Sequence, residues 1–221
     1  MTFSQFVRDE NQIKNYAIEI SVFKSGENDK KGSRTLFLSA GKICFEKGNI
    51  TSNKCKQYSS IYIRLYSDSS STCSYSTFRE NSQTESSSLV FDNVDSSVSQ
   101  EISYCNIIDN KCRKDKDQVL FRCSRSVYVD HCVFLNNDAK FMFEHIDSDA
   151  ALTISYSYFD SESTKGENIV FNERKPNSEL NVLEHFFTEN CYIILRKKLS
   201  IKVPYLAKFA NTATELFISK Q

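Results

Sequence analysis

The sequence predicts an all-β protein: a right-handed parallel β-helix solenoid of about five to six coils, forming a single domain over residues 1–221. Three observations predict it: a repeated pattern, short apolar stretches that alternate as strands do, and a scarcity of glycine and proline. The chain contains 5 Gly and 2 Pro. Because tight hairpins favour glycine, this scarcity favours parallel strands joined by longer connections.

The repeated pattern reads apolar-x-apolar-x-x-small-x-Phe-x-x-Asn. Its large apolar anchors are Phe45, Phe78, Ile107, Phe134, Phe159 and Phe187, spaced by 33, 29, 27, 25 and 28 residues. Three positions after the anchors stand Gly48, Asn81, Asn110, Asn137, Glu162 and Asn190. One repeat cannot bury its own apolar face, whereas stacked repeats can. We therefore expect the anchors to form an interior column and the asparagines to hydrogen-bond between coils.

A second apolar strand is expected between successive anchors. The candidates are Ile61–Ile63, Leu89–Phe91, Val119–Phe121, Phe141–Phe143, Ile169–Phe171 and Tyr192–Ile194. No repeat contains ten residues with a clean helical period, so helix–turn–helix repeats are not expected. A leucine-rich-repeat protein has a similar period and stays an alternative, although the Phe-centred strand and the Ser-rich connections disfavour it.

The repeats cover residues 36–195. The segments on either side of them are expected to close the solenoid, because open ends invite edge pairing. Residues 1–35 are predicted to form an N-terminal cap and the first strand. Within them, Met1–Lys14 is a candidate for a short amphipathic helix, and Tyr16–Phe23 alternates as a strand does. Residues 196–221 are the predicted C-terminal cap.

The coil pattern over residues 36–195, in the form that has Cys before Phe, resembles the right-handed parallel β-helix repeats of the pectin-lyase-like superfamily. Tyr128–His131 (Tyr-Val-Asp-His) further resembles a Trp-Ile-Asp-His stretch of pectate lyases. Those lyases also carry an Arg-x-Pro-x-x-Arg element. Here Arg174-Lys-Pro176 begins similarly, but Glu179 stands where the second arginine belongs. The departure removes the catalytic base, so the resemblance implies the fold and not the activity.

The charge balance is neutral, with 28 Lys and Arg against 28 Asp and Glu. A nucleic-acid or anionic-membrane partner usually requires a basic excess, so neither is expected. No stretch approaches 18 apolar residues, so no membrane span is expected. Met1–Phe23 has no apolar run like that of a secretory signal, so the default expectation is a cytoplasmic protein whose eight cysteines are reduced.

Two clusters of side chains, one of carboxylates and one of thiols, are candidates for chemistry. Glu80 and Asp109 each follow an anchor by two residues, so stacking would bring them about 4.8 Å apart. This is close to the carboxyl spacing of retaining glycosidases, about 5–5.5 Å. This spacing keeps a polysaccharide lyase or hydrolase acting on glycans as the alternative function. The competing interpretation is that both acids are solvated at the turn, with Arg79 as a partner. Cys105 and Cys132 share a column, but two thiols are too few for a zinc site, so no metal or cofactor is expected.

An aromatic column precedes the anchors by three positions. It contains Tyr75, Tyr104, His131 and Tyr156. Its parity is opposite to that of the buried anchors, so these rings should face outward. Stacked exposed rings form the amphipathic surface that binding sites use, although tyrosine also favours strands for other reasons. We therefore expect a non-enzymatic solenoid that presents a rigid surface for protein or carbohydrate recognition, with these four residues as ligand-binding candidates.

Overall fold

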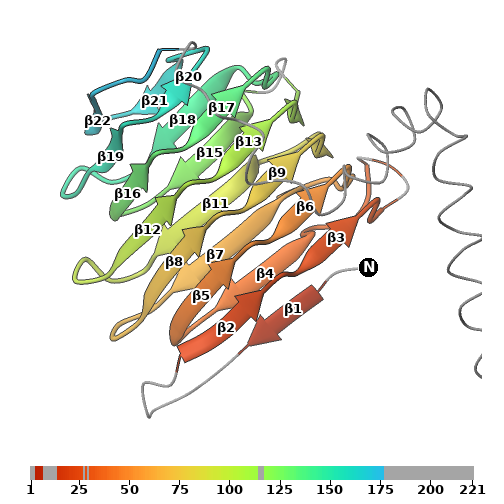
Figure 1. The fold of residues 1–221 in the computed structure, drawn as a ribbon, viewed down its shortest axis with the longest axis horizontal. Helices are drawn as coiled ribbons and strands as arrows, with labels where there is room; N and C mark the ends of the chain where they lie inside the picture. The colour runs from red at the N-terminus through yellow and green to blue at the C-terminus, as the bar shows by residue number, and fades with distance from the viewer. Residues whose placement is uncertain (1–2, 7–13, 27, 29, 114–116, 177–221) are drawn as a thin grey trace, which may run out of the picture. The chain divides into compact units, whose positions relative to one another are not determined.

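The protein is an all-β parallel solenoid of about five coils, which confirms the predicted fold class (Figure 1). The computed structural model describes residues 3–6, 14–26, 28, 30–113 and 117–176. Within these residues every regular element is a β-strand. Every strand pairing among them is parallel. Each coil therefore contributes one strand in turn to each of three long sheets.

The strands of each sheet stack in chain order. Sheet A contains β1 (Phe3–Phe6), β4 (Leu36–Ser39), β7 (Ile61–Leu65), β11 (Ser87–Asn93), β15 (Val119–Cys123), β18 (Phe141–His145) and β21 (Thr164–Gly166). Sheet B contains β2 (Lys14–Ile18), β5 (Lys42–Glu46), β8 (Ser70–Ser74), β12 (Ser99–Ser103), β16 (Ser126–Asp130), β19 (Leu152–Ser155) and β22 (Ile169–Asn172). Sheet C contains β3 (Ser21–Phe23), β6 (Asn49–Thr51), β9 (Thr77–Arg79), β13 (Asn106–Ile108), β17 (Val133–Leu135) and β20 (Tyr158–Phe159). A short fourth sheet pairs β10 (Ser82–Gln83) with β14 (Lys111–Cys112).

The anchor column is confirmed in sheet C. Phe78, Ile107, Phe134 and Phe159 are paired in register, and none is more than 1% exposed. Burying side chains of this size contributes roughly 1.5–3 kcal/mol each. This column therefore forms a large part of the apolar interior.

The first anchor was placed wrongly. Ile50, not Phe45, is paired with Phe78, whereas Phe45 belongs to sheet B, opposite Cys73. An aliphatic residue occupies the anchor position in this coil, so a search for phenylalanine shifted the alignment by five residues. Phe45 is nevertheless buried, and its ring centroid lies 6.1 Å from that of Phe78. Gly48 lies beneath that ring, where an added Cβ would come within 2.1 Å of a Phe45 ring carbon.

The second set of strands was predicted at the right places in sheet A, and its register is wrong at one step only, since Ile61 pairs with Leu89 and Val119 with Phe141 as aligned. Leu89, rather than Phe91, pairs with Phe121. A slip of two residues keeps every side chain on the same face, so periodicity alone does not detect it. Ile169–Phe171 was assigned to the wrong sheet, since it pairs with β19 in sheet B. The candidate strand Tyr192–Ile194 lies outside the described residues.

The N-terminal helix prediction is wrong where the structure describes it. Phe3–Phe6 form β1, which pairs in parallel with β4, so these backbone groups bond to the next coil rather than along a helix. Tyr16–Phe23 is not one strand: β2 and β3 are separated at Glu19, whose φ is 58°. The predicted C-terminal cap, residues 196–221, lies outside the described residues.

A ladder of amides, buried except for the half-buried Asn137, follows sheet C and confirms the predicted role of the repeated asparagines in the described coils. This Asn ladder consists of Asn53, Asn81, Asn110 and Asn137, with Asn53 in the place assigned to Gly48. The Nδ2 atoms of Asn81 and Asn110 each donate to a carbonyl oxygen of the preceding coil at 2.8 Å. Their Oδ1 atoms accept from the backbone N–H of the preceding asparagine at 3.0 Å. The amides therefore join consecutive coils in the interior.

Candidate functional site

The four predicted ligand-binding residues lie at the corner between sheets B and C, one per coil. Tyr75, Tyr104, His131 and Tyr156 have φ angles of 49°, 53°, 50° and 47°. Each backbone N–H donates to a carbonyl oxygen of the following coil, at 3.0 to 3.2 Å. The rings face outward because of this left-handed turn, and not only because of strand parity as the sequence suggested.

These side chains form a continuous stack, the aromatic ladder. Its successive ring centroids are 5.2, 5.0 and 5.2 Å apart, with interplanar angles of 7°, 21° and 17°. Rings lying side by side in one plane cannot approach so closely, so neighbouring faces overlap as in offset stacking. The inner rings, Tyr104 and His131, therefore have neighbours on both faces. The ladder offers solvent mainly ring edges and polar groups.

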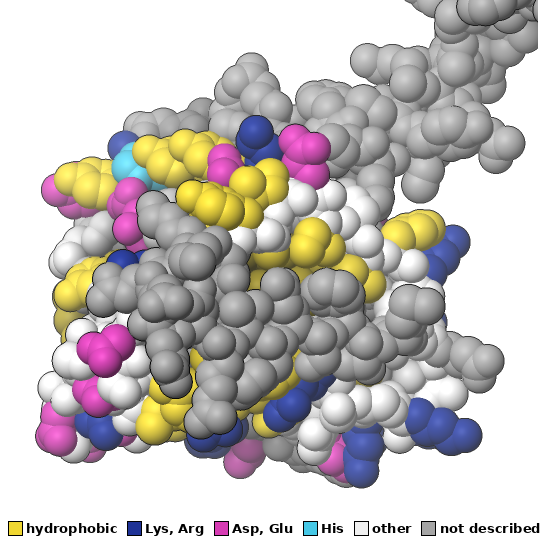
Figure 2. Space-filling model, turned by 90° about the horizontal axis from the view of Figure 1, so that it is seen from below, with side chains coloured by type: hydrophobic (Ala, Val, Ile, Leu, Met, Phe, Trp, Pro, Cys, Tyr) yellow, Lys and Arg dark blue, Asp and Glu magenta, His cyan; other side chains and the backbone are white. Residues whose placement is uncertain are grey.

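The aromatic ladder is exposed. The exposed fractions of Tyr75, Tyr104 and Tyr156 are 41%, 36% and 37%. Figure 2 shows one face of the molecule, on which hydrophobic side chains (yellow) are exposed between charged and polar ones. Of the two histidines in the described part of the chain, His131 is exposed and His145 is only 1% exposed.

Charged groups surround the ladder. His131 Nδ1 lies 2.6 Å from Asp130 Oδ2. At the C-terminal end, Lys175 Nζ lies 5.6 Å from the Tyr156 ring centroid. The pKa of Tyr156 is raised, because its hydroxyl bonds to the Glu173 carboxylate, whose charge also opposes ionisation. The ladder therefore combines apolar ring edges with hydroxyls, an imidazole and charges of both signs.

A row of small polar residues runs beside the ladder on the outer face of sheet B. Ser74, Ser103, Asp130 and Ser155 occupy this row in successive coils and are partly exposed. Beyond it lies a more exposed row that includes Glu101 and Tyr128, the latter 50% exposed. The outer row also contains Thr72 and Thr153, so large side chains border the serine row only in the two middle coils.

The candidate carboxylates Glu80 and Asp109 lie at the next corner, after sheet C, in adjacent coils. Arg79 contacts both: its Nη2 lies 3.0 Å from Glu80 Oε1 and its Nε lies 3.6 Å from Asp109 Oδ2. Ser52 Oγ also donates to Glu80 Oε2 at 3.0 Å. The two acids are thus part of an ion-pair cluster with Arg79, the partner that the non-catalytic interpretation of the sequence gave them.

Cys105 and Cys132 occupy one buried column, as the sequence indicated. The Cys105 N–H donates to Cys132 Sγ at 3.4 Å, and the Cys132 N–H donates to Ser157 Oγ at 2.9 Å. Both cysteines are free thiols. Burial raises the pKa of each thiol well above its ordinary value, which suppresses the reactive thiolate. In the described part of the chain, no three His, Cys, Asp or Glu residues gather as metal ligands.

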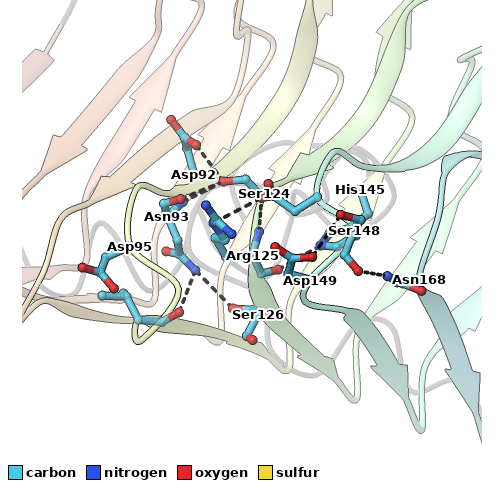
Figure 3. A network of polar contacts seen from close by, with 12 residues as sticks. Asp92, Asn93, Asp95, Ser124, Arg125, Ser126, His145, Ser148, Asp149 and Asn168 are labelled. Atoms are coloured by element: carbon cyan, nitrogen blue, oxygen red, sulfur yellow. Dashed lines mark hydrogen bonds and ion pairs between the residues drawn. The ribbon is translucent and has the colours of Figure 1, made fainter.

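A polar cluster that sequence reasoning missed lies between sheets A and B, and Figure 3 shows it. Ser124 Oγ donates to Asp92 Oδ1 at 2.7 Å and accepts from the Asn93 N–H at 2.9 Å. The buried His145 has Nδ1 and Nε2 each 3.0 Å from a backbone carbonyl oxygen, those of Glu167 and Arg125. The signal in the sequence was the polar residues at the ends of the buried strands of sheet A. These residues fall outside the aligned positions of the repeat.

The described residues contain no helix of the length and apolarity that crossing a membrane requires. No family model matches this sequence, and no curated protein or solved structure matches it. The comparisons therefore assign the parallel solenoid to no family.

Proposed function

We propose that this chain is a non-enzymatic solenoid of the pectin-lyase-like type that presents a rigid surface for recognition of a protein or a carbohydrate. The aromatic ladder, Tyr75, Tyr104, His131 and Tyr156, is the centre of that surface. The observation that carries the proposal is an exposed stack of four rings held at one fixed corner of four successive coils.

The rigidity of the ladder supports this role. The backbone at each rung is bonded to the next coil, and each ring is packed against its neighbours. Binding to such a surface loses little conformational entropy, because the side chains are already ordered. Exposed tyrosines combine contact area with a polar tip, which is why they are enriched in recognition surfaces.

The alternative, a polysaccharide lyase or hydrolase, is less well supported. A glycosidase needs one carboxyl group whose pKa is raised so that it can act as an acid. Glu80 and Asp109 are instead both ion-paired to Arg79, at 3.0 and 3.6 Å. Turnover of a glycan by the purified chain, abolished by Asp109→Asn, would establish the alternative in place of recognition.

Glycan-array binding and capture by purified candidate proteins test the proposal. The variant replaces Tyr75, Tyr104 and Tyr156 with Asn, because asparagine tolerates the left-handed backbone of the corner. The control replaces Tyr16 and Tyr66, two exposed tyrosines outside the ladder, with Asn. We expect at least tenfold weaker binding by the ladder variant and unchanged binding by the control. Equal binding by both would remove the ladder from the proposal.

A further inference from the structure

The outer face of sheet A carries a column of large side chains with one gap. Paired positions in successive coils give Phe37, Tyr62, Val90, Arg122, Glu144 and Lys165. Val90 is the smallest side chain of this column. The missing volume leaves a slot between the Tyr62 ring on one side and the Arg122 guanidinium on the other.

The slot is a pocket of about 160 Å³. The residues of its lining that matter here are Tyr58, Tyr62, Asp92, Arg122, Ser124 and Ile146. Pockets for drug-sized ligands are roughly 300–1,000 Å³, so this one suits a single ring. Ile146, which is 50% exposed, supplies an apolar side chain at the rim.

The polar groups of the pocket are held in place before any ligand arrives. Asp92 accepts from the Tyr62 hydroxyl at 3.1 Å and from Ser124 Oγ at 2.7 Å, a bond drawn in Figure 3. Arg122 Nε lies 3.2 Å from Glu144, which is itself largely buried and also pairs with Lys165 at 2.8 Å. The Tyr62 ring packs against the Phe37 ring, with 5.1 Å between the ring centroids, and the Arg34 guanidinium lies 4.9 Å from the Tyr62 centroid.

The chemistry of this lining selects among ligand classes. A cation would meet Arg122, and an anion would meet the Asp92 carboxylate. A purely hydrocarbon ring would cover charged groups without bonding to them, which is costly. A neutral group that both donates and accepts hydrogen bonds avoids these costs. A carboxylate has about four acceptor sites and a guanidinium five N–H donors, so both can serve a ligand beside their present partners.

We propose that this slot binds one neutral sugar unit, with its carbon-bound hydrogens against Tyr58, Tyr62 and Ile146 and its hydroxyls toward Asp92 and Arg122. Sugar hydroxyls both donate and accept, and the ring has the size that the slot allows. The site lies on sheet A and does not depend on the aromatic ladder, which lies between sheets B and C.

The test is a titration of the full chain, labelled at isoleucine methyl groups, with neutral monosaccharides at millimolar concentrations. We expect a saturable shift of the Ile146 methyl resonance and a dissociation constant in the millimolar range. Val90→Phe fills the slot with a ring of the kind that Phe37 already places in this column, and should weaken binding at least tenfold. Val170→Phe, the same change at an exposed site of sheet B, is the matched control and should bind normally.

Asp92→Asn, which keeps the side-chain shape, provides a second variant whose circular dichroism should be unchanged and whose affinity should fall severalfold. The proposal is overturned if no sugar gives a saturable shift or if Val90→Phe binds as the parent does. It is also overturned if acetamide or p-cresol, which represent amide and tyrosine side chains of a protein partner, shifts the resonance while sugars do not. The ladder variant should retain the shift, so failure here and failure of the ladder are separate results.

Discussion

Two ladders run along the solenoid at neighbouring corners, and they differ in how far their side chains are buried. The Asn ladder is buried and the aromatic ladder is exposed, yet both repeat one kind of side chain in four successive coils. The difference becomes visible in the coils where each ladder ends.

At the aromatic corner the residue type is free to change. Lys47 and Glu173 occupy the same corner in the flanking coils, with φ angles of 54° and 47°. The Lys47 N–H makes the same kind of bond to the next coil, to the Ser74 carbonyl oxygen at 3.1 Å. The turn therefore forms without an aromatic ring, so the turn itself does not explain four rings in a row.

At the Asn ladder another side chain serves as the donor at one position where asparagine is absent. The Phe159 carbonyl oxygen lies in the column of carbonyls that the amides serve, two coils beyond Ile107, with Phe134 between them. It accepts instead from the Arg174 guanidinium, which also pairs with Glu162 at 2.6 Å. A donor is thus supplied to a carbonyl at the end of the column by another residue, as expected for an interior polar group.

The largest effect is expected from breaking the Asn ladder with Asn110→Leu. This change removes the partner of the Asn81 N–H, of one Asn81 amide hydrogen and of the Phe78 carbonyl oxygen. Since a buried polar group that loses its partner costs roughly 1–3 kcal/mol, we expect a loss of about 3–6 kcal/mol in the free energy of unfolding. Urea denaturation measures it.

The control for that experiment is Asn136→Gly, at the exposed position that precedes Asn137 of the ladder, where φ is 53°. Glycine accepts this backbone conformation, so the change should cost less than about 1 kcal/mol. Equal losses for both variants would show that the buried amide has no special role.

The second-largest effect is expected from Phe134→Ala, which removes a fully buried ring from the apolar interior. Large-to-small changes of this kind cost about 3–5 kcal/mol, because the cavity adds to the lost transfer energy. The melting temperature should fall accordingly. An unchanged melting curve would contradict the register that places Phe134 between Ile107 and Phe159.

A smaller effect is expected from Tyr104→Asn in the aromatic ladder. The change removes two ring contacts, each worth about 0.5–1.5 kcal/mol, from a side chain that is 36% exposed. We expect a loss below about 1.5 kcal/mol by the same denaturation assay, well under that of Asn110→Leu. A loss as large as that of Asn110→Leu would make the ladder structural and would remove the contrast on which the proposed function depends.

The sequence was sufficient for the fold because the repeat combines two independent signals. Phe78, Phe134 and Phe159 mark the interior, and Asn81, Asn110 and Asn137 mark the following corner at a constant distance of three residues. Their agreement fixes the register in the coils where both are present. The aromatic column follows from the same alignment, so its stacking was predictable although its ligand was not.

The alignment failed where one of the two signals was weak. In the coil of Ile50 the anchor is aliphatic, and Phe45 drew the alignment away from Asn53. The slot over Val90 was not predictable, because it comes from one small side chain between Tyr62 and Arg122, and the register toward Arg122 had been misplaced by two residues. A search for repeated residues does not find a site that forms where one residue, here Val90, departs from the repeat.

The smallest effect is expected at the end of the aromatic ladder, where Glu173→Gln should lower the pKa of Tyr156. The carboxylate raises that pKa by accepting the phenol hydrogen and by its charge, so the neutral phenol is the form that the folded state favours. The stabilisation is therefore present below the ordinary tyrosine pKa of about 10 and is lost as pH rises through the higher folded-state pKa. Nuclear magnetic resonance of ring-labelled tyrosine follows this ionisation directly. If Tyr156 titrates identically in both proteins, Glu173 does not contact the last ring of the ladder in solution, and the ladder ends in solvent.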